Sequence, residues 1–204
     1  VTSPEASRVE VAVPSTTTTF GNTDMTTCTL YDSNTDLPLS SYAFGKLVST
    51  KTWHPDDGTA QSGTLASVTD GNNHTTTLSN WYRGIPGKVT YADTTYQTAA
   101  INDAGWITSV TDENAYTTGY QYDAMGRVKE IDYPTGDDVA WNKTFISFAP
   151  VGGSEYGIPA GHWKQTICTG SVAGTCNGNA YTVAYFDALW RPLVTESYDA
   201  ANPT

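Results

Sequence analysis

The sequence predicts an all-β protein made of repeated antiparallel β-hairpins that form a curved sheet. Two compositional observations support this. Aromatic residues make up 12% of the chain and charged residues only 15%, and aromatic and β-branched side chains favour strands. Residues that favour helices, such as Lys, Glu, Leu and Met, are scarce, and no long stretch has an apolar period near that of a helix. The third observation is an internal repeat.

The repeat has a period of 21 residues. Four glycines fall at that interval, namely Gly63, Gly84, Gly105 and Gly126. The segments Gly63–Thr76 and Gly105–Thr118 are identical at eight of fourteen positions. A fixed period of this length is typical of stacked supersecondary units, each of which needs its neighbours to cover its apolar face.

Each unit is expected to fold as strand, turn, strand. The turns are predicted at Asp70–Asn73 and at Asp112–Asn114, whose side chains tolerate tight or left-handed backbone. Apolar residues lie two and five positions after three of the four glycines, as in Leu65 and Val68. Because this spacing is not strict alternation, we expect a bulge or bend near each glycine.

The repeat divides the chain into four regions. Residues 1–40 are rich in Thr and Ser and are expected to be strands or an arm. Residues 41–140 carry the regular repeats, and residues 141–180 form an insertion with several Gly and Pro residues. Residues 181–204 return to a degenerate repeat that is cut off at the last residue, so we expect the chain to be a piece of a longer protein.

Charge and hydropathy exclude several classes of function. The net charge is −11 with only ten Lys and Arg residues, so we expect neither nucleic acid nor an anionic membrane as partner. No run of apolar residues is long enough to span a bilayer. Three scattered histidines and three cysteines lack the spacing of a zinc site, so we expect no metal and no cofactor.

The positions of the cysteines suggest one disulfide bond. Cys168 and Cys176 flank a Gly- and Ser-containing stretch that resembles a turn, so a disulfide between them could close a hairpin in an oxidising compartment. Cys28 has no evident partner.

A motif around Gly126 resembles a known family. Tyr122-Asp123-Ala124-Met125-Gly126-Arg127-Val128 is similar to the YD repeat of bacterial Rhs and wall-associated proteins, which are related to teneurins. The segment Gly105–Asp112 resembles the other half of that repeat. Phe186–Arg191 is a variant with Trp190 in place of the glycine. The matching positions are Tyr122, Asp123, Gly126, Arg127, Gly105, Asp112, Gly63, Asp70, Gly84, Asp187 and Arg191.

The resemblance implies a structural role. In such proteins the repeats form a hollow shell that encloses a C-terminal toxin or effector, or part of an adhesion ectodomain. This chain would be a segment of the wall, secreted or at the surface of a bacterial cell. Its partners would be neighbouring repeats and the enclosed domain, and its open strands could pair edge to edge with other copies.

The residues of the motif are interpreted as structural, and no residue is expected to be catalytic. Tyr122 could stack on the equivalent ring of the next unit. Asp123 could accept backbone N–H bonds before Gly126, and Arg127 could pair with Asp123 or with an acid on the next strand.

Two other functions stay open. Exposed tryptophans could stack on sugar rings, which would make the chain a carbohydrate-binding or adhesion module. The candidates are Trp53, Trp81, Trp106, Trp141, Trp163 and Trp190. Alternatively, two carboxylates on one strand face, such as Glu130 and Asp132, could act as a hydrolase pair. Asp–Asn turns could also attract calcium, but ordinary turn chemistry explains them.

Overall fold

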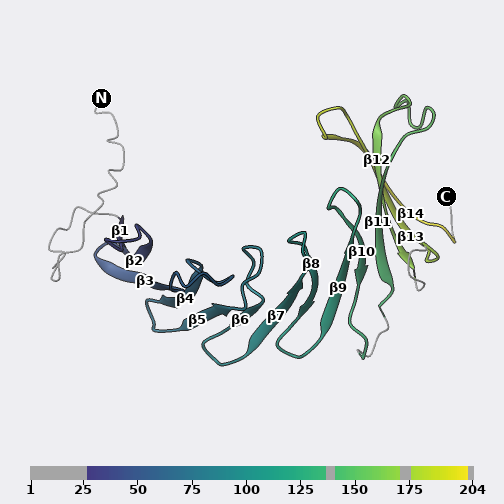
Figure 1. Ribbon diagram of the computed structural model, residues 1–204. Coiled ribbons are helices and arrows are strands. Elements are labelled where there is room, and N and C mark those ends of the chain that lie inside the picture. The colour runs from purple at the N-terminus through teal and green to yellow at the C-terminus, as the bar shows by residue number, and fades with distance from the viewer. Residues whose placement is uncertain (1–26, 137–140, 171–175, 202–204) are drawn as a thin grey trace, which may run out of the picture. The chain divides into compact units, whose positions relative to one another are not determined.

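The computed structural model describes residues 27–136, 141–170 and 176–201. These residues form fourteen β-strands and no helix, and the strands follow one another in chain order within a single antiparallel sheet (Figure 1). The predicted class, an all-β fold of repeated antiparallel hairpins, is therefore confirmed. The Thr-rich stretch before Thr27, which was expected to form strands or an arm, lies outside the described residues.

The chain divides into two units, Val1–Thr98 and Ala99–Thr204, with the boundary inside strand β7. The strands of the first unit are β1 (Thr27–Tyr31), β2 (Pro38–Ala43), β3 (Lys46–Trp53), β4 (Leu65–Asp70), β5 (Thr75–Ser79), β6 (Lys88–Thr90) and the start of β7 (Tyr96–Ile101). Each pairs with the next one along the chain, as in Val68 opposite Thr76.

The second unit continues with the end of β7 and seven further strands. They are β8 (Ile107–Thr111), β9 (Thr117–Tyr122), β10 (Val128–Asp132), β11 (Lys143–Pro150), β12 (Trp163–Gly170), β13 (Ala180–Phe186) and β14 (Pro192–Asp199). The region 141–180, expected as an insertion, contributes β11 and β12, which pair over their full length from Lys143–Gly170 to Pro150–Trp163.

Bulges occur beside two of the repeat glycines. The register of β10 against β9 shifts between Val128 and Glu130, just after Gly126. The register of β3 against β4 shifts where Trp53 faces Leu65, just after Gly63. At these two places the structure bears out the bend predicted from the apolar spacing, since an extra residue on one strand breaks the alternation of faces.

Burial is concentrated in the strands that follow the regular repeats. A small hydrophobic core contains Val151, Ile158, Val183 and Tyr185, with Val194 packed against it. Phe145 of β11 and Cys168 of β12 are also buried. In β4 to β9, by contrast, side chains are half-buried or exposed throughout. The repeat hairpins therefore depend on interactions other than a buried core.

Candidate functional site

The turn between β9 and β10 is built around Asp123. The Asp123 N–H donates to the Arg127 carbonyl at 2.9 Å, and the Gly126 N–H donates to the Asp123 carbonyl at 3.0 Å. The Asp123 Oδ1 accepts the N–H groups of Met125 at 2.9 Å and Arg127 at 3.0 Å. Gly126 has a φ of 80°, which glycine adopts without steric cost. One carboxylate oxygen thus fixes a three-residue loop.

The Arg127 side chain adds a second contact to the Asp123 carboxylate. Its Nε donates to the Asp123 Oδ2 at 2.7 Å, and its guanidinium carbon lies 4.4 Å from the centre of the Phe148 ring. Of the two partners considered for Arg127, the structure gives Asp123. The Arg127 N–H and then its side chain hold the pKa of Asp123 below its usual value, because both bonds favour the charged carboxylate.

The same backbone pattern recurs along the chain. In each case residue i donates to the carbonyl of residue i+4, and residue i+3 donates back to the carbonyl of residue i. These turns begin at Asp70, Tyr91, Asn102, Asp112, Asp123 and Asp187. The i+3 positions have positive φ and are occupied by Asn73, Thr94, Gly105, Ala115, Gly126 and Trp190. Glycine is therefore not required for this geometry.

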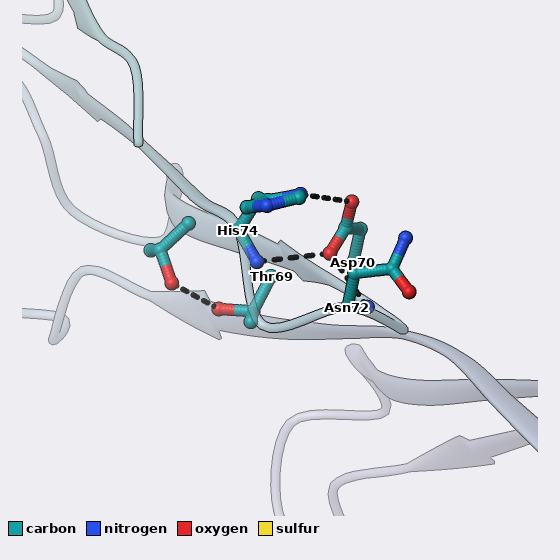
Figure 2. Close-up of polar contacts among 5 residues, drawn as sticks. Thr69, Asp70, Asn72 and His74 are labelled. Atoms are coloured by element: carbon teal, nitrogen blue, oxygen red, sulfur yellow. Dashed lines mark hydrogen bonds and ion pairs between the residues drawn. The ribbon is translucent and has the colours of Figure 1, made fainter. Parts of the chain in front are cut away.

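Figure 2 shows the first of these turns. The Asp70 Oδ1 accepts the N–H groups of Asn72 at 2.8 Å and His74 at 2.9 Å. The His74 Nδ1 lies 3.1 Å from the Asp70 Oδ2, in the place that Arg127 occupies in the later turn. Beside it, the hydroxyls of Thr69 and Thr75 lie 2.8 Å apart. Asp112 binds the N–H groups of Asn114 and Tyr116 in the same way.

Asp187 and Arg191 reproduce the Asp123 turn in the degenerate repeat. The Asp187 Oδ1 accepts the N–H groups of Leu189 and Arg191, and Arg191 Nε donates to Oδ2 at 2.7 Å. Trp190 stands at the glycine position with a φ of 60°. The replacement of Gly by Trp noted in the sequence therefore leaves the hydrogen bonds of the turn unchanged.

Gly63 and Gly84 occupy different turns from Gly105 and Gly126. The Gly63 N–H donates to the His54 carbonyl at the end of a longer loop. Gly84 lies in a two-residue turn with Arg83, closed by reciprocal backbone bonds between Tyr82 and Ile85. All four glycines have positive φ, so the 21-residue interval marks a shared glycine conformation in turns of three different kinds.

Aromatic side chains close the open ends of three hairpins, a feature that the sequence did not suggest. The Tyr122 hydroxyl donates to the Ile107 carbonyl at 2.6 Å. Trp81 Nε1 donates to the Leu65 carbonyl at 3.1 Å, and Trp53 Nε1 donates to the Pro38 carbonyl at 3.0 Å. In each hairpin the acceptor is the first residue of one strand, and the donor lies at or just beyond the end of the next strand. A spacing of 15 or 16 residues is the signal that could have revealed them.

Tyr122 also contacts a ring of its own hairpin. Its ring centre lies 5.1 Å from that of Trp106, so the stacking expected on the next unit is made instead within one hairpin. Trp106 in turn covers Gly126, where an added Cβ would lie 2.9 Å from the indole. Tyr122, Trp106 and Gly126 therefore interlock across the turns at this end of β8, β9 and β10.

The two cysteines of the predicted pair form a disulfide. Cys168 lies in β12, and Cys176 precedes β13. Cys168 is buried, and so is the free Cys28 in β1. The bond therefore links the end of β12 to the segment that leads into β13.

The paired carboxylates of β10 are bridged by a lysine. Lys143 Nζ lies 3.2 Å from Glu130 Oε1 and 2.6 Å from Asp132 Oδ2. Glu130 is only 3% exposed, so no substrate could reach its carboxylate directly. The Asp132 side chain and then the Glu130 side chain raise the pKa of Lys143. This geometry is that of a structural ion network.

A second charged network covers the small core. Glu155 accepts hydrogen bonds from the Tyr185 hydroxyl at 2.6 Å and from Lys164 Nζ at 3.0 Å. Burial and then Glu155 raise the pKa of Tyr185 well above its usual range, while Tyr185 and Lys164 lower the pKa of Glu155. The loop that carries Glu155 is thereby fastened to β12 and β13.

The tryptophans fall into three groups. Trp53, Trp81 and Trp106 belong to the hairpin ends described above. Trp163 and Trp190 stack with ring centres 6.0 Å apart. Trp141 is 61% exposed, and it lines a groove of about 740 Å³ with Asp112, Tyr116, Tyr133, Pro134, Asn142, Thr144 and Thr169.

Residues 27–136, 141–170 and 176–201 contain no group of three or more His, Cys, Asp or Glu that could hold a metal ion. Nor does any helix there have the length and apolarity to cross a membrane.

Sequential hairpins closed by repeated aspartate turns define a class of protein: a β-hairpin repeat protein whose units use local hydrogen bonds in place of a large core. The RHS Repeat family model matches residues 102–138. This segment runs from the Asn102 turn through the Asp123 turn and past β10. The segment 102–138 therefore carries a repeat of the Rhs/YD type, in agreement with the motif at Tyr122–Val128. Repeats of this family are typically structural and occur in secreted or cell-surface proteins. No curated protein matches the chain.

Proposed function

We propose that this chain is a non-catalytic wall segment of an Rhs/YD-repeat shell that encapsulates or displays a C-terminal toxin or effector. One observation carries the proposal: the same hydrogen-bonded turn recurs six times while the residues around it vary. Repetition of this kind preserves a backbone and not a constellation of reactive groups. Structural repeats extend by adding units that contact mainly their neighbours.

The distribution of charge supports a structural role. The aspartates of these turns bind backbone N–H groups, and Asp123 and Asp187 also bind the arginine four residues later. Glu130 and Asp132 share Lys143, and Glu155 is shared by Tyr185 and Lys164. Each of these carboxylates is engaged in holding strands or turns, whereas a hydrolase needs a carboxylate that faces its substrate.

The proposed location is the outside of a bacterial cell. The disulfide between Cys168 and Cys176 suits an oxidising compartment. The net charge of −11 disfavours nucleic acid, and it keeps a secreted protein soluble.

The proposed partners are further repeats and the enclosed domain. Among the described strands, β14 pairs only with β13, and β1 pairs only with β2. An outer strand presents N–H and C=O groups that can pair with another strand. We therefore expect the isolated chain to self-associate through these edges. Light scattering over a range of concentrations would show an increasing mass, whereas a constant monomer mass would contradict edge pairing.

The test of the shell proposal uses the intact parent polypeptide from its source. Top-down mass spectrometry should find this sequence within a much longer chain that carries further repeats. Limited proteolysis should then spare the C-terminal domain in native buffer and degrade it after mild denaturation. The same domain, expressed alone, is the control for its intrinsic resistance.

Two results would overturn the proposal. One is a mature protein that ends near Thr204. The other is a C-terminal domain that is cleaved equally fast inside the native parent and alone.

A further inference from the structure

A small pocket lies between the start of β12 and the turn that joins β13 to β14, within the second unit. Its volume is about 290 Å³, near the lower limit of small-molecule sites. Neither the proposed shell nor the hydrogen bonds of the aspartate turn require an open pocket at this place. Its described lining consists of Gly161, His162, Trp163, Asp187, Ala188 and Trp190.

Two indole rings form the aromatic wall of the pocket. The rings of Trp163 and Trp190 have their centres 6.0 Å apart and their planes inclined by only 22°. Trp190 also contacts the rings of Phe148 and Phe186, yet it remains 51% exposed, and Trp163 remains 38% exposed. Aromatic side chains that only fill a core lose most of their exposure. This pair therefore offers indole surface to a ligand.

Trp190 stands at a position where a smaller residue would serve the turn. Its φ of 60° is a left-handed conformation that is unfavourable for a bulky side chain. The equivalent turn of Asp123 has Gly126 at this position, and the hydrogen bonds of the two turns are the same. Backbone strain of this kind is concentrated at functional sites. The turn alone does not explain the tryptophan, whereas a binding role does.

Both walls of the pocket are fixed by backbone hydrogen bonds. The Gly161 N–H donates to the Val151 carbonyl at 2.9 Å, and the Val151 N–H donates to the His162 carbonyl at 2.6 Å. Because Val151 is buried in the small core, this wall is attached to the core. In the other wall, the Trp190 N–H donates to the Asp187 carbonyl at 3.0 Å. A site that is held before binding loses less conformational entropy when a ligand arrives.

The charges favour a cation inside the pocket and an anion at its edge. Asp187 lines the pocket, and no Lys or Arg occurs among its described lining residues. Arg191 lies beside it, with Nε 2.7 Å from the Asp187 Oδ2. The Arg191 side chain is 72% exposed, whereas that of Asp187 is 16% exposed. A guanidinium that solvent can reach therefore lies next to a more buried carboxylate.

An aromatic wall with a single carboxylate suits a quaternary ammonium group. Such a group has no N–H to donate, so it needs no cluster of acceptors, and the negative face of an indole attracts it. A primary ammonium or a metal ion needs several oxygen partners, whereas Asp187 is the one carboxylate in the described lining. A neutral apolar ligand would cover that carboxylate without compensating its charge.

We propose that this pocket binds phosphocholine. The trimethylammonium group lies against Trp163 and Trp190, beside the Asp187 carboxylate, and the phosphate lies outside the pocket, where it pairs with Arg191. Arginine has several N–H donors, and its contact with Asp187 through Nε leaves others for the phosphate oxygens. The two opposite charges of the ligand thus match the neighbouring opposite charges of Asp187 and Arg191.

The test titrates the full 204-residue chain with phosphocholine and with choline at constant ionic strength, and it follows the indole N–H resonances by NMR. Phosphocholine should shift the resonances of Trp163 and Trp190 to saturation and leave that of Trp141 unchanged. Choline should bind more weakly, because it lacks the phosphate. Dimethylbutanol, in which carbon replaces the nitrogen of choline, should bind about tenfold more weakly than choline, because it has no charge to interact with the indoles.

Trp190→Gly removes one indole and keeps the turn, because Gly126 occupies the same position in the Asp123 turn. It should weaken phosphocholine binding about tenfold or more. Trp141→Ala is the matched control, since Trp141 is 61% exposed but lines a different groove, and it should leave the affinity unchanged. Loss of binding in Trp141→Ala but not in Trp190→Gly would place the site elsewhere and refute the proposal.

Arg191→Gln tests the orientation of the ligand. It should weaken the binding of phosphocholine but not that of choline, because only the phosphate needs the guanidinium group. Choline serves here as the internal control for the integrity of the pocket in the variant. Equal weakening of both ligands would contradict the pairing of the phosphate with Arg191.

The source of the phosphocholine group is distinguished by sedimentation with phosphatidylcholine vesicles. Cosedimentation that free phosphocholine competes away would assign the group to a lipid surface. Binding of free phosphocholine without cosedimentation would assign it to a soluble molecule. The wild-type titrations decide the proposal without any variant: no saturable binding of phosphocholine, or equal binding of choline and dimethylbutanol, would overturn it.

Discussion

The repeat strands β8 to β10 and the longer strands β11 to β14 are both antiparallel, but different interactions hold them. The repeat strands depend on the turns, where Asp123 alone accepts two backbone N–H bonds and binds Arg127. The longer strands bury Val151, Ile158, Val183 and Tyr185 and carry the disulfide. The comparison teaches that one sheet can change from local to non-local stabilisation without changing its strand order.

The two arginine turns sharpen this contrast. The Asp123 and Asp187 turns have the same hydrogen bonds, yet one has glycine at the third position after the aspartate and the other has Trp190. At Gly126 the Trp106 ring leaves no space for a Cβ. Packing against Trp106 therefore explains this glycine better than the backbone angle does, since Thr94 and Ala115 adopt similar angles.

The largest effect is expected from Gly126→Val. A valine there would have both an unfavourable positive φ and a Cβ within 2.9 Å of Trp106. Left-handed strain and overpacking together should lower the free energy of unfolding by about 4 kcal/mol. Urea denaturation followed by circular dichroism measures the change.

Gly84→Val separates the two causes. Gly84 has nearly the same φ, 79°, but nothing lies within 4 Å of its added Cβ. It should cost only about 1–2 kcal/mol, the strain alone. Equal losses at the two glycines would contradict the role assigned to Trp106.

Removal of the disulfide should have the next largest effect. Cys168 and Cys176 are eight positions apart in the sequence, and closure of a loop of that size is worth about 2.5 kcal/mol in the chain-entropy account. Addition of a reductant should lower the midpoint of urea denaturation accordingly. The Cys168→Ala/Cys176→Ala variant should not respond to reductant; a response would implicate Cys28 instead.

Val183→Ala tests the small core. Val183 is buried among Val151, Ile158 and Tyr185, so loss of its two methyl groups should cost about 2 kcal/mol. Val128→Ala, at a half-buried position in β10, should cost less than half as much. If both variants lose the same free energy in urea denaturation, the two regions do not differ in the way described.

Tyr122→Phe tests the closure of a repeat hairpin. The substitution keeps the ring on Trp106 but removes the hydroxyl that donates to the Ile107 carbonyl. The expected loss is about 1 kcal/mol, typical of a single hydrogen bond with a half-buried partner. Tyr120→Phe, on the same strand, is the control and should be neutral. Hydrogen exchange of β8 and β9 should accelerate in Tyr122→Phe only.

Features fixed by neighbouring residues were predictable from the sequence. The turns at Asp70 and Asp112 and the bulge after Gly126 follow from side chains within a few positions of one another. The contacts that were missed join residues far apart in sequence, as Glu155 and Tyr185 do. The groove was equally hidden, because Tyr116, Tyr133 and Trp141 belong to separate loops and strand ends. The 21-residue period carries no information on contacts that occur once.

The smallest effect is expected from Asp123→Asn. An amide oxygen can still accept the two backbone bonds, as Asn102 does for Ala104 and Trp106, but the ion pair with Arg127 is lost. Because the folded-state pKa of Asp123 is lowered, its charge stabilises the fold above the unfolded pKa of about 3.9. That stability is lost as the pH falls through the lower folded value. The wild type should therefore melt slightly above the variant at neutral pH, and the difference should vanish in acid.

Asp187→Asn provides the comparison with the degenerate repeat. The Arg191 side chain is 72% exposed, against 30% for Arg127, so solvent screens its ion pair more strongly. Melting curves over a pH series should show a smaller neutral-pH difference for Asp187→Asn than for Asp123→Asn. A melting-temperature difference that persists unchanged in acid would mean that the aspartates act through hydrogen-bond geometry and not through charge. The two turns would then be equally stabilising, although only Arg127 packs on Phe148.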